Sequence, residues 1–402
     1  MSNTLKFIDM VAREALAVAH EKTQFIATTD RQYDDSFGKS GAKIGSTLRV
    51  RNPNRYTVRQ GSRVMDVQDQ NESVQTVTVA TQSGVDMRFN SAELTLDTDS
   101  PDQVAAFTKR YIEPAASVLM STIESNYLAA STKATANMVG QGSSAAIGTA
   151  ISTLAAPGIA RARLNQMLAP KGDRNIQMDS ITMAGLVSGV AAYFNPSNAI
   201  SEQYKEGLIA RTSMADYYEN ERCWTMPNAG DVATTLDTYT VVEGDTDITV
   251  ATLSAAPVAG MVFTIAGAYD VHPETKAAYS HLKQFTVTSA TTTVINFSPA
   301  ISLSGATQNV SATPDTTAAV AFAGSATTNY VQSLMYHKDA FQFVTADLPL
   351  MDDAHKCTRR TQDGISLRVW MASDIRNDEL LMRLDILHGY AALRPEWACR
   401  IA

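Results

Sequence analysis

Residues 232–328 differ from the rest of the chain, and this difference constrains the fold more than any other feature. The stretch is rich in Thr, Ala, Ser and Val and has few helix-forming residues. Short apolar segments recur along it, separated by turn residues such as Pro257, Gly260 and Pro299. Short strands with this spacing are typical of a barrel or sandwich. The sequence therefore predicts a separate all-β domain, with strands at 239–242, 248–250, 262–265, 285–288 and 294–297.

The segments on either side of this domain mix helical and extended patterns. After the domain, apolar segments follow at 341–344, 367–370 and 380–390. The two flanks read as halves of one region that contains both helices and strands. The expected fold class is therefore α+β, with the β domain as an insertion.

A long helix is predicted over residues 100–131. Ser100, Pro101 and Asp102 give a clear start, because serine is a favoured cap, proline is tolerated in the first turn, and an acid there suits the helix dipole. Apolar residues then lie on one side from Val104 onward. Proline lacks an amide hydrogen, so Pro114 should kink or split the helix.

Residues 46–97 form a second β-rich region, with strands expected at 47–51, 56–59, 74–79, 85–89 and 94–96. Its first part carries five arginines in fifteen residues. Three interpretations are open: a solvated strand face, a salt-bridge surface between subunits, or phosphate binding. Arginine pairs with carboxylates in a planar fork, which favours the second over the third, because no aromatic side chains interleave with these arginines. The candidate contact residues are Arg49, Arg51, Arg55, Arg59 and Arg63.

Apolar residues at helical spacing predict an amphipathic helix over residues 4–22, and a polar stretch follows at 33–39. Two interpretations are open. The helix is either the first core helix of a domain or an arm that reaches a neighbouring subunit.

The composition excludes several classes of protein. The net charge is −8, which argues against a free nucleic-acid-binding enzyme, and charged residues make up only 18%. A low charge content suits a protein whose surface is largely covered by other subunits. Three widely spaced cysteines indicate neither a disulfide framework nor a zinc site. No leader or membrane-spanning run is recognised, so we expect a protein made in the cytoplasm. The cysteines are Cys223, Cys357 and Cys399.

No catalytic constellation is recognised. Gly38, Lys39 and Ser40 resemble the end of a phosphate loop, but Tyr33 occupies the position where that motif needs glycine. A nucleophile elbow is missing, and the six histidines are scattered without ligand spacing. Acid pairs such as Asp352–Asp353 are better explained as solvated loop residues than as metal ligands. We expect no catalytic residue, cofactor or metal, and therefore no enzyme.

Several stretches together resemble the major capsid (coat) protein family of short-tailed phages typified by phage P22. The resemblance spans nearly the whole chain in element order, and its motifs are structural. The stretches are ALAV at 15–18, RQYDDSF at 31–37, FNPSNAISEQYKEG at 194–207, GMVFTIAG at 260–267, FTV at 285–287 and GYAALRPE at 389–396.

This resemblance implies an HK97-type capsid fold with an inserted β-barrel. It assigns 1–45 to an N-terminal arm, 46–99 to an extended β-loop and peripheral-domain strands, 100–137 to the spine helix, 138–231 and 329–375 to the axial domain, 232–328 to the inserted barrel and 376–402 to the peripheral domain. The implied function is the major capsid protein of a tailed double-stranded DNA phage. Copies would form hexamers and pentamers of a procapsid in the host bacterial cytoplasm, and later the virion capsid.

The implied partners are other copies of the chain, a scaffolding protein, a portal protein at one vertex, and packaged DNA bound without sequence specificity. No membrane is implied. The family's inserted domain carries a long acidic hairpin that reaches the neighbouring capsomer, whereas the matching stretch here is shorter. Glu243, Asp245 and Asp247 are therefore candidates either for intersubunit contact or for a plain acidic turn. Two other classes stay open: a β-rich surface or adhesion protein, and a hydrolase with an accessory β domain.

Overall fold

The computed structural model describes residues 12–17, 23–32, 47–51, 53–59, 61, 63–65, 67, 68, 74–90, 108–140, 153–190, 215–228, 231–351, 356–362 and 364–402. The chain divides into two compact units. Unit 1 comprises Met1–Val50, Gln75–Tyr127 and Phe341–Ala391, and unit 2 comprises Arg51–Val74, Leu128–Ala340 and Ala392–Ala402.

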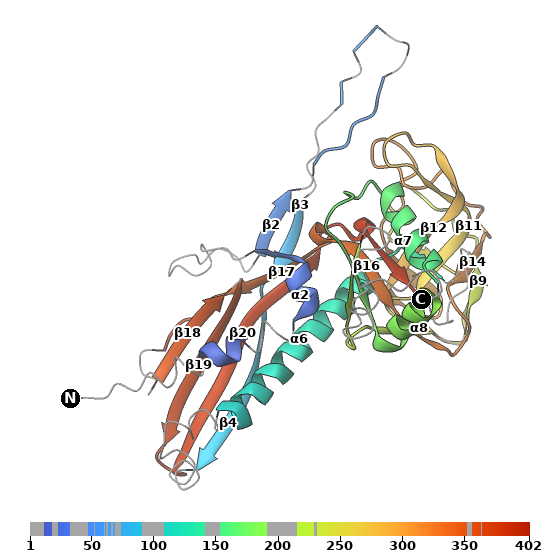
Figure 1. The fold of residues 1–402 in the computed structure, drawn as a ribbon. Coiled ribbons are helices and arrows are strands. Elements are labelled where there is room, and N and C mark those ends of the chain that lie inside the picture. Colours follow the sequence, from blue (N-terminus) through green and yellow to red (C-terminus); the bar gives the residue numbers. More distant parts are fainter. Residues whose placement is uncertain are drawn as a thin grey trace. The chain divides into compact units, whose positions relative to one another are not determined.

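Unit 1 is built around a six-stranded sheet (Figure 1). Apolar and polar residues alternate along its strands, so that Leu367 and Ile386 lie against Leu119 and Met120 of the long helix. Two further strands, β2 (Thr47–Arg51) and β3 (Val74–Thr78), form a separate ladder. The sheet order is β1 (Asp30–Gln32), β17 (Phe341–Ala346), β20 (Glu379–Ala392), β19 (Ile365–Asp374) and β18 (Lys356–Gln362), and β4 (Thr81–Asn90) also pairs with β20.

The long predicted helix is present as α6 (Glu113–Ala134), which follows a π-helical turn, η1 (Thr108–Ile112). The helix type thus changes just before Pro114. In the first turn of α6 the missing amide hydrogen of Pro114 costs no helical hydrogen bond. Residues 100–107, where the predicted start lies, are outside the described residues.

One side of the described N-terminal residues is buried in unit 1. Ala12 and Ala15, in the helical stretch 12–17, are fully covered, as is Phe25 in α2 (Gln24–Thr28). The amide of Phe25 donates to buried Glu124 of α6 at 2.7 Å, and its ring lies 4.7 Å from the ring of Tyr127. These residues match the interpretation as a core segment. The rest of the predicted helix and the polar stretch 33–39 lie outside the described residues.

Unit 2 contains a five-stranded sheet whose core is shared with two helices, α7 (Ala155–Gln166) and α8 (Ser180–Val190). The sequence also predicts helices at 157–168 and near 200–210; the first corresponds to α7, and the second lies outside the described residues. The sheet order is β5 (Met138–Val139), β21 (Ala398–Ile401), β16 (Ser333–His337), β6 (Arg174–Met178) and β7 (Asp216–Glu219). Shorter elements are β8 (Thr225–Pro227), β15 (Asn329–Val331), η3 (Lys338–Ala340) and η4 (Pro395–Trp397).

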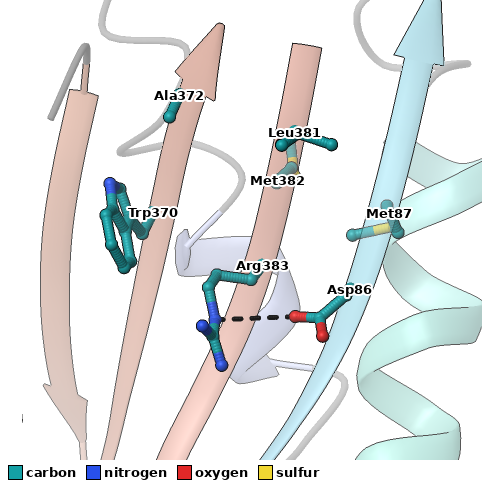
Figure 2. Close-up of a pocket in the computed structure, with 7 residues that line it drawn as sticks. All are labelled: Asp86, Met87, Trp370, Ala372, Leu381, Met382 and Arg383. Atoms are coloured by element: carbon teal, nitrogen blue, oxygen red, sulfur yellow. Dashed lines mark ion pairs between the residues drawn. The ribbon is translucent and has the colours of Figure 1, made fainter. Parts of the chain in front are cut away.

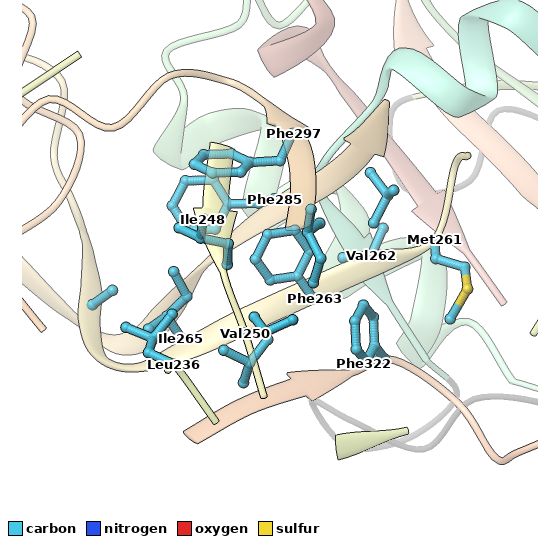
Figure 3. Close-up of a cluster of buried hydrophobic side chains, with 14 of the residues drawn as sticks. Leu236, Ile248, Val250, Met261, Val262, Phe263, Ile265, Phe285, Phe297 and Phe322 are labelled. Carbon is cyan, nitrogen blue, oxygen red and sulfur yellow. The ribbon is translucent and has the colours of Figure 1, made fainter. Parts of the chain in front are cut away.

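The inserted domain is a closed β-barrel within unit 2. Its two end strands, β9 and β10, meet through a bridge between Leu236 and Val250, and the amide of Ala251 donates to the carbonyl of Thr235 at 2.9 Å. Aromatic rings fill the interior, with Phe263 within 6 Å of three others (Figure 3). The strand order is β10 (Asp247–Thr249), β13 (Val294–Ser298), β12 (Ala278–Ala290), β11 (Val262–Val271), β14 (Ala319–Phe322) and β9 (Ala233–Thr235).

The predictions of a mixed α+β chain and of an all-β insertion are confirmed, but two predicted strands are absent. In 239–242 the Asp245 carboxylate accepts the Val242 amide at 2.8 Å, and in 56–59 the Gln68 side chain accepts the Thr57 amide at 2.9 Å. Side chains that bind the backbone locally compete with a strand ladder. The predicted strand at 94–96 lies outside the described residues.

Candidate contact surfaces

Residues 53–68, here named the arginine loop, extend from β2 toward β3 and are held by their own side chains. The side-chain amide of Gln68 accepts the Thr57 amide and donates to the Thr57 carbonyl at 2.7 Å. The Arg59 guanidinium donates to the carbonyl of Val64. These hydrogen bonds hold the two sides of the loop together where no strand pairing is described. Most of the other described side chains of the loop point into solvent.

The arginine loop exposes apolar side chains that a soluble loop would normally lack. Val58, Val64, Met65 and Val67 are 76–84% exposed, and Tyr56 is also exposed. Burying apolar surface contributes about 25 cal/mol per Å². Exposed apolar side chains of this kind make the loop a candidate contact surface.

The predicted arginines fall into three groups. Arg55 pairs with Glu396 of its own chain at 3.7 Å, and both side chains are partly exposed. Arg59 and Arg63 are exposed, and neither forms an ion pair with another described residue. Arg49 and Arg51 lie in β2, but their side chains are outside the described part of the structure. The exposed cations and the apolar residues thus share one loop.

Two of the predicted acids bind within their own domain. Glu243 accepts hydrogen bonds from the Ser302 hydroxyl at 2.6 Å and the Leu303 amide at 2.5 Å, and the Ser302 bond is the main reason its pKa is lowered. Asp245 accepts from the Tyr239 hydroxyl at 3.1 Å. Burial, with help from that bond, raises the pKa of Tyr239 to about 12.

Asp247 differs from these two acids. It is exposed, and in the described part of the chain no side chain binds its carboxylate. The barrel as a whole is poor in cations, since residues 232–328 hold seven acids, two lysines and no arginine. Both lysines bind inside the domain: Lys276 donates to the Ala306 carbonyl, and Lys283 pairs with Asp270. The barrel surface is therefore acidic.

An apolar pocket of about 350 Å³ lies on the sheet of unit 1 (Figure 2). Leu381 is partly exposed there, and the indole nitrogen of Trp370 is buried without a hydrogen-bond partner. Figure 2 shows Arg383 and Asp86 pointing toward one another from β20 and β4, with 3.5 Å between Nε and Oδ1. The lining residues are Asp86, Met87, Trp370, Ala372, Leu381, Met382 and Arg383.

A buried ion-pair network supports the floor of this pocket. Asp385 is fully buried and accepts from Arg368 at 2.7 Å and from Arg383 at 3.0 Å. Both guanidinium groups lie within 6 Å of the Trp370 ring, in cation–π range. Gly84 faces Asp385 across the strands, and a Cβ there would approach the carboxylate oxygen to 2.5 Å. The network fixes the side chains around the pocket.

The described residues contain no group of three or more His, Cys, Asp or Glu that could hold a metal ion. Cys399 is fully buried, and burial raises the pKa of its thiol to about 12, so it is a poor nucleophile. Among these same residues, no helix is long and apolar enough to cross a membrane.

Sequence reasoning missed the pocket. The signal was weak: Trp370 falls in the polar phase of β19, between Arg368 and Ala372. Its partners come from β4 and β20, and that pairing cannot be read from local patterns. The sequence did single out the arginines, but it gave no sign that Arg55 pairs within its own chain.

Comparison with known proteins supports a family assignment. The family model described as "P22 coat protein - gene protein 5" matches residues 58–399. No curated protein sequence matches the chain. Among solved structures, it is similar to that of Mycobacterium phage Che8, with 10% identity, 94% and 90% of the two chains covered and a TM-score of 0.49. The capsid of Ralstonia phage GP4 matches with 7% identity, 94% and 90% covered and a TM-score of 0.47. The CUS-3 coat protein I-domain matches with 25% identity, 23% and 94% covered and a TM-score of 0.18.

Proposed function

Because this chain belongs to the P22 coat protein family, it is a major capsid protein of a tailed phage, and we propose that copies of it meet through the arginine loop to build an icosahedral procapsid. Hexamers and pentamers of the chain form the shell in the host bacterial cytoplasm. A scaffolding protein guides assembly, and a portal protein occupies one vertex. The domain assignment given by the resemblance, with 232–328 as the inserted domain, is part of this proposal.

The exposed apolar residues of the arginine loop carry the proposal. A monomer gains nothing from holding Val58, Val64 and Val67 in water. A neighbouring copy that covers them gains about 1.5–3 kcal/mol for each fully buried side chain. Repeated contacts that do not close on themselves locally generate an extended lattice. Arg59 and Arg63 then set the register, because exposed ion pairs contribute specificity more than affinity.

The pocket beside Trp370 is the second surface that we assign to contact between copies. Its walls are apolar and Leu381 is exposed. The indole N–H of Trp370 has no hydrogen-bond acceptor among the described residues. The arginine loop of another copy supplies apolar side chains and backbone carbonyls, and its cations complement the exposed Asp86 at the rim. Such a contact buries apolar surface on both copies.

The packaged DNA is held without sequence-specific contacts. A wall rich in cations would bind DNA tightly through the release of counterions. The chain has a net charge of −8 and an acidic barrel, which leaves the genome free to move during packaging and release.

Electron microscopy of the purified chain, with and without its scaffolding protein, tests this function. The wild type should form closed shells or open sheets. The double variant Arg59→Glu, Arg63→Glu should stay monomeric on gel filtration while keeping its circular dichroism spectrum. Arg376→Glu, a single charge reversal at an exposed turn of the unit 1 sheet, is the control and should assemble. Normal shells from the double variant would exclude the loop arginines as contacts, and a wild type that never assembles would overturn the function.

A further inference from the structure

Arg400, in β21, is the largest fully buried side chain among the described residues. No carboxylate in that part of the chain pairs with it. Removing a guanidinium from water is costly unless its hydrogens find acceptors. Burial accordingly lowers the pKa of Arg400 to about 9, which still leaves the group charged at neutral pH. A buried, unpaired cation needs a structural reason.

The guanidinium of Arg400 donates to oxygens on three different segments. Nη1 donates to the carbonyl of Gly260 at 2.5 Å, and Nη2 donates to the carbonyl of Lys133 and the hydroxyl of Thr286, each at 3.0 Å. Gly260 and Thr286 belong to the barrel, Lys133 ends α6, and Arg400 itself lies in the sheet formed by β5, β21 and β16. One side chain therefore links the barrel to both of its supports.

The acceptor at Lys133 suits a cation. The last carbonyls of a helix have no partner within the helix and carry the negative end of its dipole. The Lys133 carbonyl also accepts the Thr286 hydroxyl at 2.8 Å. Arg400 and Thr286 thus cap the end of α6 together, one from the sheet and one from the barrel.

Other contacts near Arg400 also join the barrel to its neighbouring elements. The Gln284 side chain of the barrel binds the backbone of Met138 in β5 with two hydrogen bonds, of 2.8 and 2.9 Å. Gly260 has φ +98°, and a Cβ there would lie 2.6 Å from Trp224, so glycine is needed for the close approach. The Trp224 ring lies 5.8 Å from the Arg400 guanidinium and covers it.

We propose that Arg400 is a positioning residue that locks the inserted barrel to the end of α6 and to strands β5 and β21, so that these parts behave as one rigid body. Lysine cannot replace it, because a single ammonium cannot reach acceptors in three directions with a fixed fork. This inference rests on the proposed function for its consequence: a fixed barrel gives every subunit in a shell the same contacts. A loosened barrel gives particles of mixed size.

Amide hydrogen exchange on the unassembled full-length chain tests the lock directly. The amide of Met138 is the reporter, because its hydrogen bond to Gln284 breaks when the barrel detaches. The amide of Leu384, in the unit 1 sheet, reports the stability of unit 1. Arg400→Gln should speed exchange at Met138 by about 10- to 100-fold, since two or more bonds to a charged donor are lost. Exchange at Leu384 should not change. Arg400→Lys should restore only part of the protection.

Two further variants keep the proposal open to refutation. Thr286→Val removes one acceptor without changing the side-chain shape and should raise exchange at Met138 in the same direction, by a smaller factor. Arg376→Gln removes an exposed arginine and should change neither reporter. Unchanged exchange at Met138 in both Arg400→Gln and Thr286→Val, or an equal rise at Leu384, would overturn the proposal.

The assembly assay separates this inference from the proposed function. A wild type that forms shells and an Arg400→Lys variant that forms particles of several sizes support both. Uniform particles from Arg400→Lys, despite faster exchange at Met138, would refute the consequence for assembly alone. A wild type that does not assemble would refute the function while exchange still decides the role of Arg400.

Discussion

The inserted barrel and the unit 1 sheet both contain six strands, but they use their side chains differently. The barrel packs four phenylalanines in its interior, and its two lysines and three of its acids bind within the domain. The unit 1 sheet buries an ion-pair network and leaves an apolar pocket beside it. A domain whose groups are satisfied internally can fold on its own, whereas open apolar surface indicates a place for a partner. The barrel thus has a filled interior, whereas the unit 1 sheet carries the pocket that we assign to contact between copies.

The largest effect is expected from the barrel core. Phe263→Ala should lower the free energy of unfolding of the barrel by about 4 kcal/mol, because it removes a ring that contacts three others. Amide exchange at Val287 in β12 should accelerate, while exchange at Leu384 in unit 1 stays unchanged. Phe343→Ala, in unit 1, is the matched control and should show the reverse. Equal acceleration at both amides in either variant would mean that the two regions unfold together.

The barrel and the unit 1 sheet each hold a buried carboxylate in an ion pair, Asp270 and Asp385, and the two can be compared directly. Asp385→Asn should cost unit 1 about 3 kcal/mol, because Arg368 is left buried beside a neutral group. Asp270→Asn should cost the barrel less, since Asp270 pairs with Lys283 at 3.0 Å and the flexible lysine stem can carry its ammonium to water. Urea unfolding followed at Leu384 and Val287 gives both values. A larger loss of unfolding free energy with Asp270→Asn than with Asp385→Asn would mean that the barrel, not unit 1, holds the stronger ion pair.

Acid should weaken unit 1 through His388. Burial lowers the pKa of this histidine from 6.5 to about 4, and its ring stacks between Phe343 and Tyr390. The unfolded chain therefore takes up a proton as the pH falls below 6.5, and the folded unit does not do so until about 4. Stability present above pH 6.5 is lost as the pH falls, by about 2 kcal/mol between pH 7 and pH 5.

Urea unfolding at these two pH values, followed at Leu384, measures this loss. His388→Gln should remove most of the difference. Burial also lowers the pKa of His337 in unit 2, so acid should weaken that unit as well. The probe must therefore lie within unit 1. A variant as acid-sensitive as the wild type would assign the effect to another group.

The sequence predicted regions with strong local patterns and failed where distant strands meet. The short apolar segments at 262–265 and 294–297, separated by turn residues, predicted β11 and β13. The helix pattern over 100–131 predicted α6, which begins at Glu113, beside the Pro114 where a kink or split was expected. The absent strand at 239–242 has the right apolar residues, but Asp245 captures its backbone. The strand propensity of residues 239–242 does not show that a nearby side chain will bind their backbone amides.

The candidate contact residues were partly accessible from sequence. The density of arginines at 49–63 drew attention to the loop, whereas the exposed valines beside them looked like strand residues. Arg400 and Asp385 gave no signal, since a charged residue in a strand pattern is usually solvent-facing. Their burial depends on partners more than 15 residues away, such as Gly260 for Arg400 and Arg368 for Asp385.

The smallest effects are expected from the acidic turn of the barrel, where two neighbouring acids have different roles. Asp245→Asn should lower barrel stability by about 1 kcal/mol, because it weakens the bonds to the Tyr239 hydroxyl and the Val242 amide. Asp247→Asn should leave it unchanged, since no described side chain binds its carboxylate. Thermal unfolding of the unassembled chain measures both.

Shell yield then distinguishes an internal turn from a contact between copies. If Asp247 meets a neighbouring subunit, Asp247→Asn lowers the yield of particles although the monomer is as stable as the wild type. Asp245→Asn should change yield only as far as it changes stability. A barrel that is wholly self-contained would instead show normal yield with Asp247→Asn. That outcome would limit the proposed contact between copies to the arginine loop and the pocket of unit 1. The barrel would then differ from the unit 1 sheet in making no contact with a neighbouring copy through its acidic turn.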